Sequence, residues 1–312
     1  MERCRSRHQQ RHLELSSWVM NTDGYVIITP ARNEERHLQK TVDSVASQNL
    51  RPRKWIIVND GSSDNTGRLI EAAAKQHPWI KAVHRPDRGF RNNFGGEVQA
   101  FYDGYQLIKM DDWKYIAKLD CDLSFAPDYF ERLINRFSCD LHLGIASGVY
   151  LEECRSGWRE VKMPAHHAAG ACKVVRRECF KQIGGFIAER GWDTIDEIRA
   201  MTKGWKTAHF SDLQMKHLKP EGSGNGWLRT QIRQGEVFYL TGGSKFFFVL
   251  KVCNRLLRRP FLLGGAAMLW GYLELMVRRQ AILVTREEAE FYRQLLHGRM
   301  LSRVKEILQK AQ

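Results

Sequence analysis

Short apolar runs alternate along this chain with segments in which apolar residues recur at helical spacing. The runs 25–29 and 55–58 are rich in β-branched residues, and both 55–58 and 115–119 are followed directly by a polar segment that contains aspartates. Such runs predict buried strands, and the segments 34–48 and 66–77 predict the helices between them. Further strands are predicted at 80–84 and 144–150, and further helices at 93–110 and 129–137. Strands that alternate with helices predict an α/β fold with a parallel sheet.

The composition changes after residue 213. A Gly-rich stretch at 220–226 precedes helical segments rich in basic and aromatic residues, and glycine clusters of this kind mark loops. We therefore divide the chain into a basic N-terminal tail at 1–22, an α/β domain at 23–218 and a basic, helical C-terminal region at 219–312.

Two apolar runs in the C-terminal region, 246–250 and 260–277, are flanked by arginines. Basic residues beside apolar helices are typical of proteins that associate with an anionic membrane surface. The second run approaches the ~20 residues that span a bilayer, but it contains Glu274 and three glycines. Interfacial association, a packed core helix or oligomer contact, and a membrane span all remain open.

The net charge of +14 favours an anionic partner, which includes nucleotide sugars, nucleic acids and membrane surfaces. No nucleic-acid partner is expected, because basic residues are dispersed among acidic ones in the first half without a recognition signature. Seven cysteines without a CxxC pair or zinc spacing argue against a disulfide framework. Residues 1–12 lack the apolar stretch of a secretory signal. We expect a cytoplasmic protein, or one peripheral on the inner face of the membrane.

Two acidic clusters follow predicted strands directly. They are the segment 59–64, which reads Asn-Asp-Gly-Ser-Ser-Asp, and the segment 120–122, which reads Asp-Cys-Asp. Ligands of open α/β sheets gather at the carboxyl ends of strands. In extended backbone Asp120 and Asp122 would point to one side and offer oxygen ligands to one cation, for which Mg or Mn is best suited. A nucleotide diphosphate and a metal are thus indicated; a capped turn and solvated acidic residues are the alternatives.

Taken together, residues 25–217 resemble the family 2 glycosyltransferases, which are inverting enzymes of the GT-A fold that use nucleotide-diphosphate sugars. The segment 28–35 is similar to the family's first strand and nucleotide-binding loop, and 58–64 is similar to the segment that binds the base. The segment 120–122 stands at the family's DXD metal motif. The resemblance implies a Rossmann-like, mixed and mostly parallel sheet flanked by helices, with a C-terminal helical extension.

The resemblance also implies a set of site residues. Asp60 matches the aspartate that accepts a hydrogen bond from the base, and His217 matches a histidine near the metal or diphosphate. The implied donor contacts are Pro30, Arg32, Glu34, Asp60, Arg91 and Asp120, and the implied metal ligands are Asp120, Asp122 and His217.

The segment 191–199 resembles the acidic helix start that carries the family's catalytic base. Setting Arg199 on the family's arginine places Asp193 on the base. Trp192 stands where the family usually has glutamate, so the assignment keeps two competitors, Asp196 and Glu197.

The implied reaction is a single in-line displacement in which a carboxylate deprotonates the acceptor hydroxyl and a metal stabilises the departing diphosphate. A UDP-sugar is the expected donor, although the sugar and base are not specified. The chain lacks the QxxRW signature of the processive synthases, which favours a single sugar addition. A lipid-linked or cell-envelope glycan is the expected acceptor.

Two other functions compete with this interpretation. A nucleotidyltransferase would use a similar sheet and acidic pair, but it usually carries a Gly-rich phosphate loop where this chain has Pro-Ala-Arg-Asn-Glu-Glu at 30–35. A non-catalytic binder of membranes or nucleic acid would use the positive charge alone.

Overall fold

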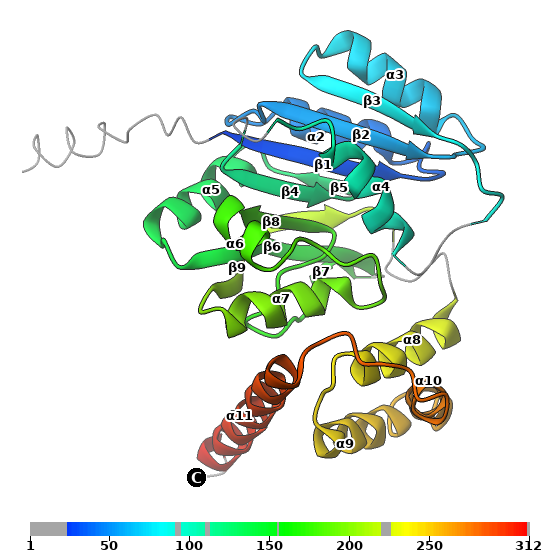
Figure 1. Ribbon diagram of the computed structural model, residues 1–312, viewed down its shortest axis with the longest axis vertical. Helices are drawn as coiled ribbons and strands as arrows, with labels where there is room; N and C mark the ends of the chain where they lie inside the picture. The colour runs from blue at the N-terminus through cyan, green and yellow to red at the C-terminus, as the bar shows by residue number, and fades with distance from the viewer. Residues whose placement is uncertain (1–23, 91–94, 110–112, 155, 220–225, 311–312) are drawn as a thin grey trace, which may run out of the picture.

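The computed structural model describes residues 24–90, 95–109, 113–154, 156–219 and 226–310 (Figure 1). The predicted N-terminal tail at 1–22 lies outside the described residues. One sheet and the helices on its two faces form the larger part of the molecule, and four further helices lie at one end (Figure 1).

The sheet is mixed and has the strand order β3-β2-β1-β4-β8-β6-β9-β5, with β7 paired to β6. Strands β1 to β4 are parallel, whereas β8 runs antiparallel to both β4 and β6. The strands are β1 (Tyr25–Ala31), β2 (Lys54–Asp60), β3 (Ile80–Arg85), β4 (Tyr115–Leu119), β5 (Leu123–Phe125), β6 (Leu143–Cys154), β7 (Gly157–Glu160), β8 (Cys172–Arg176) and β9 (Lys206–His217). This architecture confirms the expected α/β fold with a mixed, mostly parallel sheet.

Both faces of the sheet are buried because successive side chains of a strand point to opposite faces. Tyr25 and Ile27 belong to the core formed with α2, α3 and α5, while Val26 and Ile28 belong to the core formed with α4, α6 and α7. These helices are α2 (Leu38–Ala46), α3 (Thr66–Gln76), α4 (Gly96–Tyr105), α5 (Tyr129–Cys139), α6 (Arg177–Gln182) and α7 (Trp192–Thr202).

Strand β1 extends beyond the predicted run 25–29, through Pro30 to Ala31. Strand β4 pairs with β1 only as far as Ile28, so that side of β1 is already an edge at Pro30. A proline, which has no backbone N–H, is tolerated at such an edge.

The C-terminal helices are α8 (Trp227–Leu240), α9 (Lys245–Leu256), α10 (Leu263–Val277) and α11 (Arg286–Lys310). They share a core with α7, in which Ile198 packs with Phe238, Met268 and Tyr292. Helices α8 and α10 cross closely, since a Cβ at Gly235 would clash with the carbonyl oxygen of Met268. No helix in the described part of the chain combines the length and the apolar character needed to cross a membrane.

Candidate active site

A cavity of about 690 Å³ lies between one end of the sheet and the C-terminal helices. Its walls come from segments far apart in the sequence. Lys118, Asp120 and His217 line it from the sheet, Asp193 and Glu197 from α7, and Arg233, Lys251 and Arg299 from α8, α9 and α11. The C-terminal region, which the sequence analysis treats as an appended region, therefore forms part of the site.

Asp60 ends β2 and is buried. Its carboxylate accepts hydrogen bonds from Arg85 Nη1 and Arg88 Nη2, each at 2.5 Å. Arg32 donates to the Asp60 backbone carbonyl and, at 2.8 Å, to the Asp87 carboxylate. Two of the expected donor contacts, Arg32 and Asp60, thus lie side by side, in a cluster in which each guanidinium group is paired with a carboxylate.

Direct hydrogen bonds join the loops that follow β1 and β2. Glu34 N–H donates to Thr66 Oγ1 at 2.8 Å, and Ser63 N–H donates to Asn33 Oδ1 at 2.9 Å. The Glu34 carboxylate pairs with Lys219 Nζ at 2.9 Å. Arg32 and Glu34 are therefore held against the loop that follows β2, and Pro30 pairs with Val58 in the sheet. Arg91, another expected donor contact, lies outside the described residues.

Between β4 and β5 the chain forms a turn at Cys121 and Asp122, so the extended backbone expected from Asp120 to Asp122 is wrong. Asp120 Oδ1 accepts from Lys118 Nζ at 2.5 Å. Asp122 Oδ2 lies 3.5 Å from His217 Nε2. The two carboxylates therefore have different partners.

Burial raises the pKa of Asp120 to about 6, against the opposing charge of Lys118. Burial also acts to raise the pKa of Asp122, but the hydrogen bond and charge of His217 outweigh it and lower that pKa. The His217 pKa is raised in turn: burial lowers it, and the Asp122 hydrogen bond and charge more than compensate. One carboxylate of the pair is thus costly to ionise, and a bound cation would relieve that cost.

The acidic pair is suited to a divalent cation held jointly with a ligand. Asp122 Oδ1 is buried and has no hydrogen-bond partner among the described residues. Within the same residues, no group of three or more His, Cys, Asp or Glu side chains is arranged to hold a metal alone. Mg and Mn commonly bind through one or two carboxylates completed by substrate phosphates. The carboxylates of Asp120 and Asp122 fit this mode.

Asp196 and Glu197, the two competitors for the catalytic base, form a buried network around Lys173. Lys173 Nζ donates to Asp196 Oδ1 at 2.9 Å, to Glu197 Oε1 at 3.1 Å and to the Asp193 carbonyl at 2.6 Å. His167 Nδ1 lies 3.0 Å from the other Glu197 oxygen. Burial raises the pKa of Asp196 to about 7, against the charge of Lys173. These carboxylates are held by internal cations, which argues against either as the base.

Asp193 differs from these competitors. It lies in the first turn of α7, is only half-buried and lines the cavity. Its carboxylate forms no hydrogen bond or salt bridge with the residues that the structure describes. A Cβ at Gly170 would lie 3.3 Å from Asp193 Oδ2, so the glycine leaves this carboxylate open. Geometry favours Asp193 as the group that can exchange a proton with a ligand.

Two buried lysines, Lys118 and Lys173, are site residues that the sequence analysis missed. Both contact Trp192, with Lys118 Nζ 5.2 Å and Lys173 Nζ 5.3 Å from its ring centroid. Its indole N–H donates to Glu97 Oε1 at 2.6 Å. The sequence could have indicated them, because each lysine stands within an otherwise apolar strand. A fully buried lysine requires a carboxylate partner.

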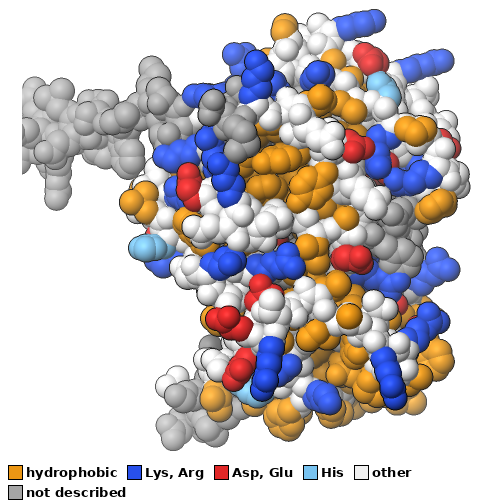
Figure 2. Space-filling view, viewed as in Figure 1, with side chains coloured by type: hydrophobic (Ala, Val, Ile, Leu, Met, Phe, Trp, Pro, Cys, Tyr) orange, Lys and Arg blue, Asp and Glu red, His pale blue; other side chains and the backbone are white. Residues whose placement is uncertain are grey.

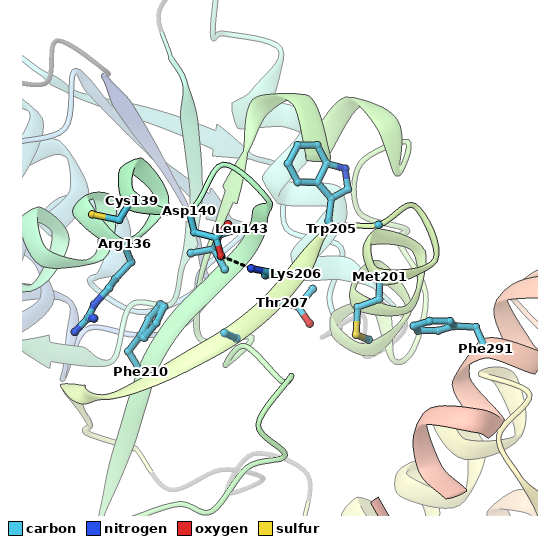
Figure 3. A pocket seen from close by; sticks show the side chains of 12 residues that line it. Arg136, Cys139, Asp140, Leu143, Met201, Trp205, Lys206, Thr207, Phe210 and Phe291 are labelled. Atoms are coloured by element: carbon cyan, nitrogen blue, oxygen red, sulfur yellow. Dashed lines mark hydrogen bonds and ion pairs between the residues drawn. The ribbon is translucent and has the colours of Figure 1, made fainter. Parts of the chain in front are cut away.

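A second cavity, of about 620 Å³, opens between α5, α7 and β9, and Phe291 of α11 also lines it (Figure 3). Its charged side chains are paired: Lys206 bonds Asp140 at 2.8 Å, and Arg136 bonds Asp212 at 2.7 Å. It lacks the converging carboxylates of the larger cavity.

Residues 26–164 match the family model described as glycosyl transferase family 2. A poly-beta-1,6-N-acetyl-D-glucosamine synthase from Staphylococcus epidermidis is 30% identical over 244 residues, which are 70% of this chain and 55% of the synthase. The chain thus spans about half the length of that relative.

Two solved structures share the fold. A mannosyltransferase from Pyrobaculum calidifontis, in complex with GDP-Man and Mn2+, has a TM-score of 0.52 and 17% identity, with 89% of this chain and 80% of the other covered. Residues 1–349 of S. aureus TarS, in complex with UDP-GlcNAc, have a TM-score of 0.52 and 14% identity, with 86% and 78% covered. At sequence identities this low, the similarity shows that the chain shares the fold of these two proteins.

Proposed function

Because the chain belongs to glycosyl transferase family 2, we propose that it transfers a sugar from a nucleotide-diphosphate donor to an acceptor hydroxyl. The observation that carries the proposal is one cavity that holds both the acidic pair's Asp120 and the open carboxylate of Asp193. A cation site for a leaving diphosphate and a free general base are the two elements that this reaction needs.

At the donor end, a UDP-sugar is the proposed ligand. The Asp60 carboxylate can accept a hydrogen bond from the ring N–H of uracil, since an ionised carboxylate has about four acceptor sites and two guanidinium groups occupy only part of them. The guanidinium groups of Arg32 and Arg88 lie beside this base site, paired with Asp87 and Asp60. Mg or Mn at Asp120, Asp122 and His217, when bound, would stabilise the departing diphosphate.

In the proposed reaction Asp193 accepts the proton of the acceptor hydroxyl while the oxygen of that hydroxyl attacks the anomeric carbon of the donor. Attack opposite the leaving diphosphate gives a single displacement and inverts the configuration. Lys173 holds the Asp193 backbone carbonyl and Lys118 holds Asp120, so the base and the diphosphate end are fixed by neighbouring strands. Such positioning lowers the entropic cost of reaction.

A lipid-linked or cell-envelope glycan is the proposed acceptor, and the apolar surface of α9 and α10 supports binding to an anionic membrane. Figure 2 shows hydrophobic side chains gathered at the end of the molecule that these helices form. Arg258 and Arg259 precede α10, and Arg278 and Arg279 follow it. Apolar surface bordered by arginines suits an interface with anionic headgroups. The exposed residues are Phe246, Val249, Leu250, Leu257, Phe261, Leu262, Leu263, Leu269, Trp270, Leu273, Met276 and Val277.

The donor proposal is tested by thermal stabilisation with UDP, GDP and dTDP, each with and without Mn2+. We expect one nucleotide to raise the melting temperature only with the metal, since a ligand at 100 times its Kd stabilises by ~2.7 kcal/mol. The double variant Asp120→Asn, Asp122→Asn should lose the shift, while Asp43→Asn, on the exposed face of α2, should keep it. No shift with any nucleotide, or an equal shift in the double variant, would exclude this donor site.

The membrane proposal is tested by sedimentation with phosphatidylglycerol vesicles. Replacing Leu257, Phe261 and Trp270 by serine should weaken binding at least about tenfold, because these exposed side chains supply apolar contact area. The matched control replaces Leu107 and Leu141, exposed apolar side chains outside the C-terminal helices, and should bind as the wild type does. Undiminished sedimentation of the triple variant would remove the basis for a membrane partner.

A further inference from the structure

The loop that precedes β8 runs along the wall of the cavity from β9 to β4. At one end the carbonyl oxygen of His167 accepts a hydrogen bond from His209 Nδ1, on β9, at 2.8 Å. At the other end the carbonyl oxygen of Gly170 accepts from Lys118 Nζ, on β4, at 3.1 Å. Strands β9 and β4 stand three places apart in the sheet, and Lys118 also bonds Asp120. Gly170 therefore lies at the end of the loop near Asp120, and His167 lies at the opposite end.

Glu197 fixes the orientation of the His167 ring. One carboxylate oxygen lies 3.0 Å from His167 Nδ1, and the other accepts from the Ala168 N–H at 2.8 Å. The Glu197 side chain is only 1% exposed, whereas that of His167 is 22% exposed and lines the cavity. A partner on one ring nitrogen sets the role of the other. His167 Nε2 forms no hydrogen bond with any residue in the described part of the chain, so this nitrogen is left for a ligand.

The His167 ring lies near the proposed base, on the side away from the donor diphosphate. Asp193 and Glu197 are four residues apart on α7, so their Cβ atoms share one face of the helix at a separation of about 5–6 Å. The loop follows this face, because a Cβ at Gly170 would lie 3.3 Å from Asp193 Oδ2 and His167 bonds Glu197. A ligand whose attacking hydroxyl meets Asp193 therefore finds His167 about one helical turn further on.

We infer that His167, oriented by Glu197, forms a hydrogen bond through Nε2 with a second hydroxyl of a saccharide acceptor and so selects acceptors that carry one. This inference rests on the proposed function, since it names an acceptor-binding residue of the same site. A hydroxyl both donates and accepts, so it suits Nε2 whether or not that nitrogen carries a proton. A simple alcohol offers the attacking hydroxyl alone and lacks this contact.

The test compares acceptors with and without a second hydroxyl. The full chain is given Mn2+ and the donor identified by thermal shift, and release of nucleoside diphosphate is measured against methyl glucoside, methyl galactoside, methyl N-acetylglucosaminide and 1-propanol. We expect at least one glycoside to show a lower KM than 1-propanol. His167→Asn should raise the KM of that glycoside about tenfold, the loss of one hydrogen bond, with a smaller effect on kcat. The advantage of the glycoside over 1-propanol should fall by the same factor.

Further variants separate recognition of the acceptor from support of the fold. Asparagine at position 167 can keep the hydrogen bond to Glu197 but has no atom at the position of Nε2. His167→Gln, whose amide can reach that position, should recover part of the lost affinity. His142→Asn is the same change at an exposed position and should leave the glycoside KM at its wild-type value.

The metal-dependent stabilisation by nucleotide should persist in all three variants, which shows that they fold and bind the donor. Absence of that stabilisation from the wild type would be a failure of the proposed function itself. A wild type that prefers no glycoside over 1-propanol, or a preference that survives in His167→Asn, would overturn the role assigned to His167.

Discussion

Replacing Asp193 by asparagine is expected to slow donor turnover by roughly 10²- to 10⁴-fold, the usual contribution of a general base. Asparagine matches the shape of aspartate but cannot accept the proton of the attacking hydroxyl. The carboxylate lines the cavity and has no internal partner among the described residues, so little stability should be lost. Turnover is measured as release of nucleoside diphosphate from the donor identified by thermal shift.

Two comparisons make this result specific. Asp43→Asn is the same chemical change on an exposed helix face and should turn over donor as the wild type does. Asp193→Asn should also keep the metal-dependent shift with nucleotide, because Asp193 is not placed in the donor site. If Asp193→Asn retains wild-type turnover, Asp193 is not the base.

Replacing Lys173 by methionine is expected to lower the free energy of unfolding at pH 8 by about 3–5 kcal/mol, the usual cost of breaking a buried ion pair. Lys173 is fully buried and bonds both Asp196 and Glu197. Methionine fills a similar volume but leaves two buried carboxylates without their cation. Urea unfolding provides the measurement.

The loss in Lys173→Met should be smaller at acid pH. Burial already raises the pKa of Asp196 to about 7 with the lysine in place, and without it the pKa rises further. Between the pKa of Asp196 in the unfolded chain and its raised pKa in the folded protein, the folded state binds more protons than the unfolded state. The free energy of unfolding of the variant therefore falls as pH increases across that window. Lys181→Met, at an exposed position on α6, should show neither effect. If Lys173→Met loses no more free energy of unfolding at pH 8 than Lys181→Met, the network around Lys173 is not essential for stability.

The sequence predicts well which loops meet at the carboxyl ends of β1 and β2, because its signals are local. An apolar run followed directly by polar and acidic residues identifies a strand's carboxyl end, and parallel strands bring those ends to one edge. Asp60 and Arg32 therefore meet as the resemblance implies. The turn between Asp120 and Asp122 was not predictable from spacing alone, since two residues at a strand end can continue the strand or reverse it.

The acceptor side depends on contacts that no local pattern specifies. Asp193, Asp196 and Glu197 occupy one acidic segment, and only the position of Lys173 on β8 distinguishes the open carboxylate from the buried ones. The packing of Ile198 against Tyr292, which places α11 on α7, joins residues from distant parts of the chain. From the sequence alone the C-terminal helices are therefore predicted to be an appended region, although in the structure they form a wall of the cavity.

The most direct test of the proposed reaction is the configuration of the sugar released from the donor, followed by NMR with Mg2+ before the anomers equilibrate. The first product should have the anomeric configuration opposite to that of the donor, and its formation should require both the cation and Asp193. Retention of configuration, or release that persists without the metal and in Asp193→Asn, would contradict a single displacement at this site.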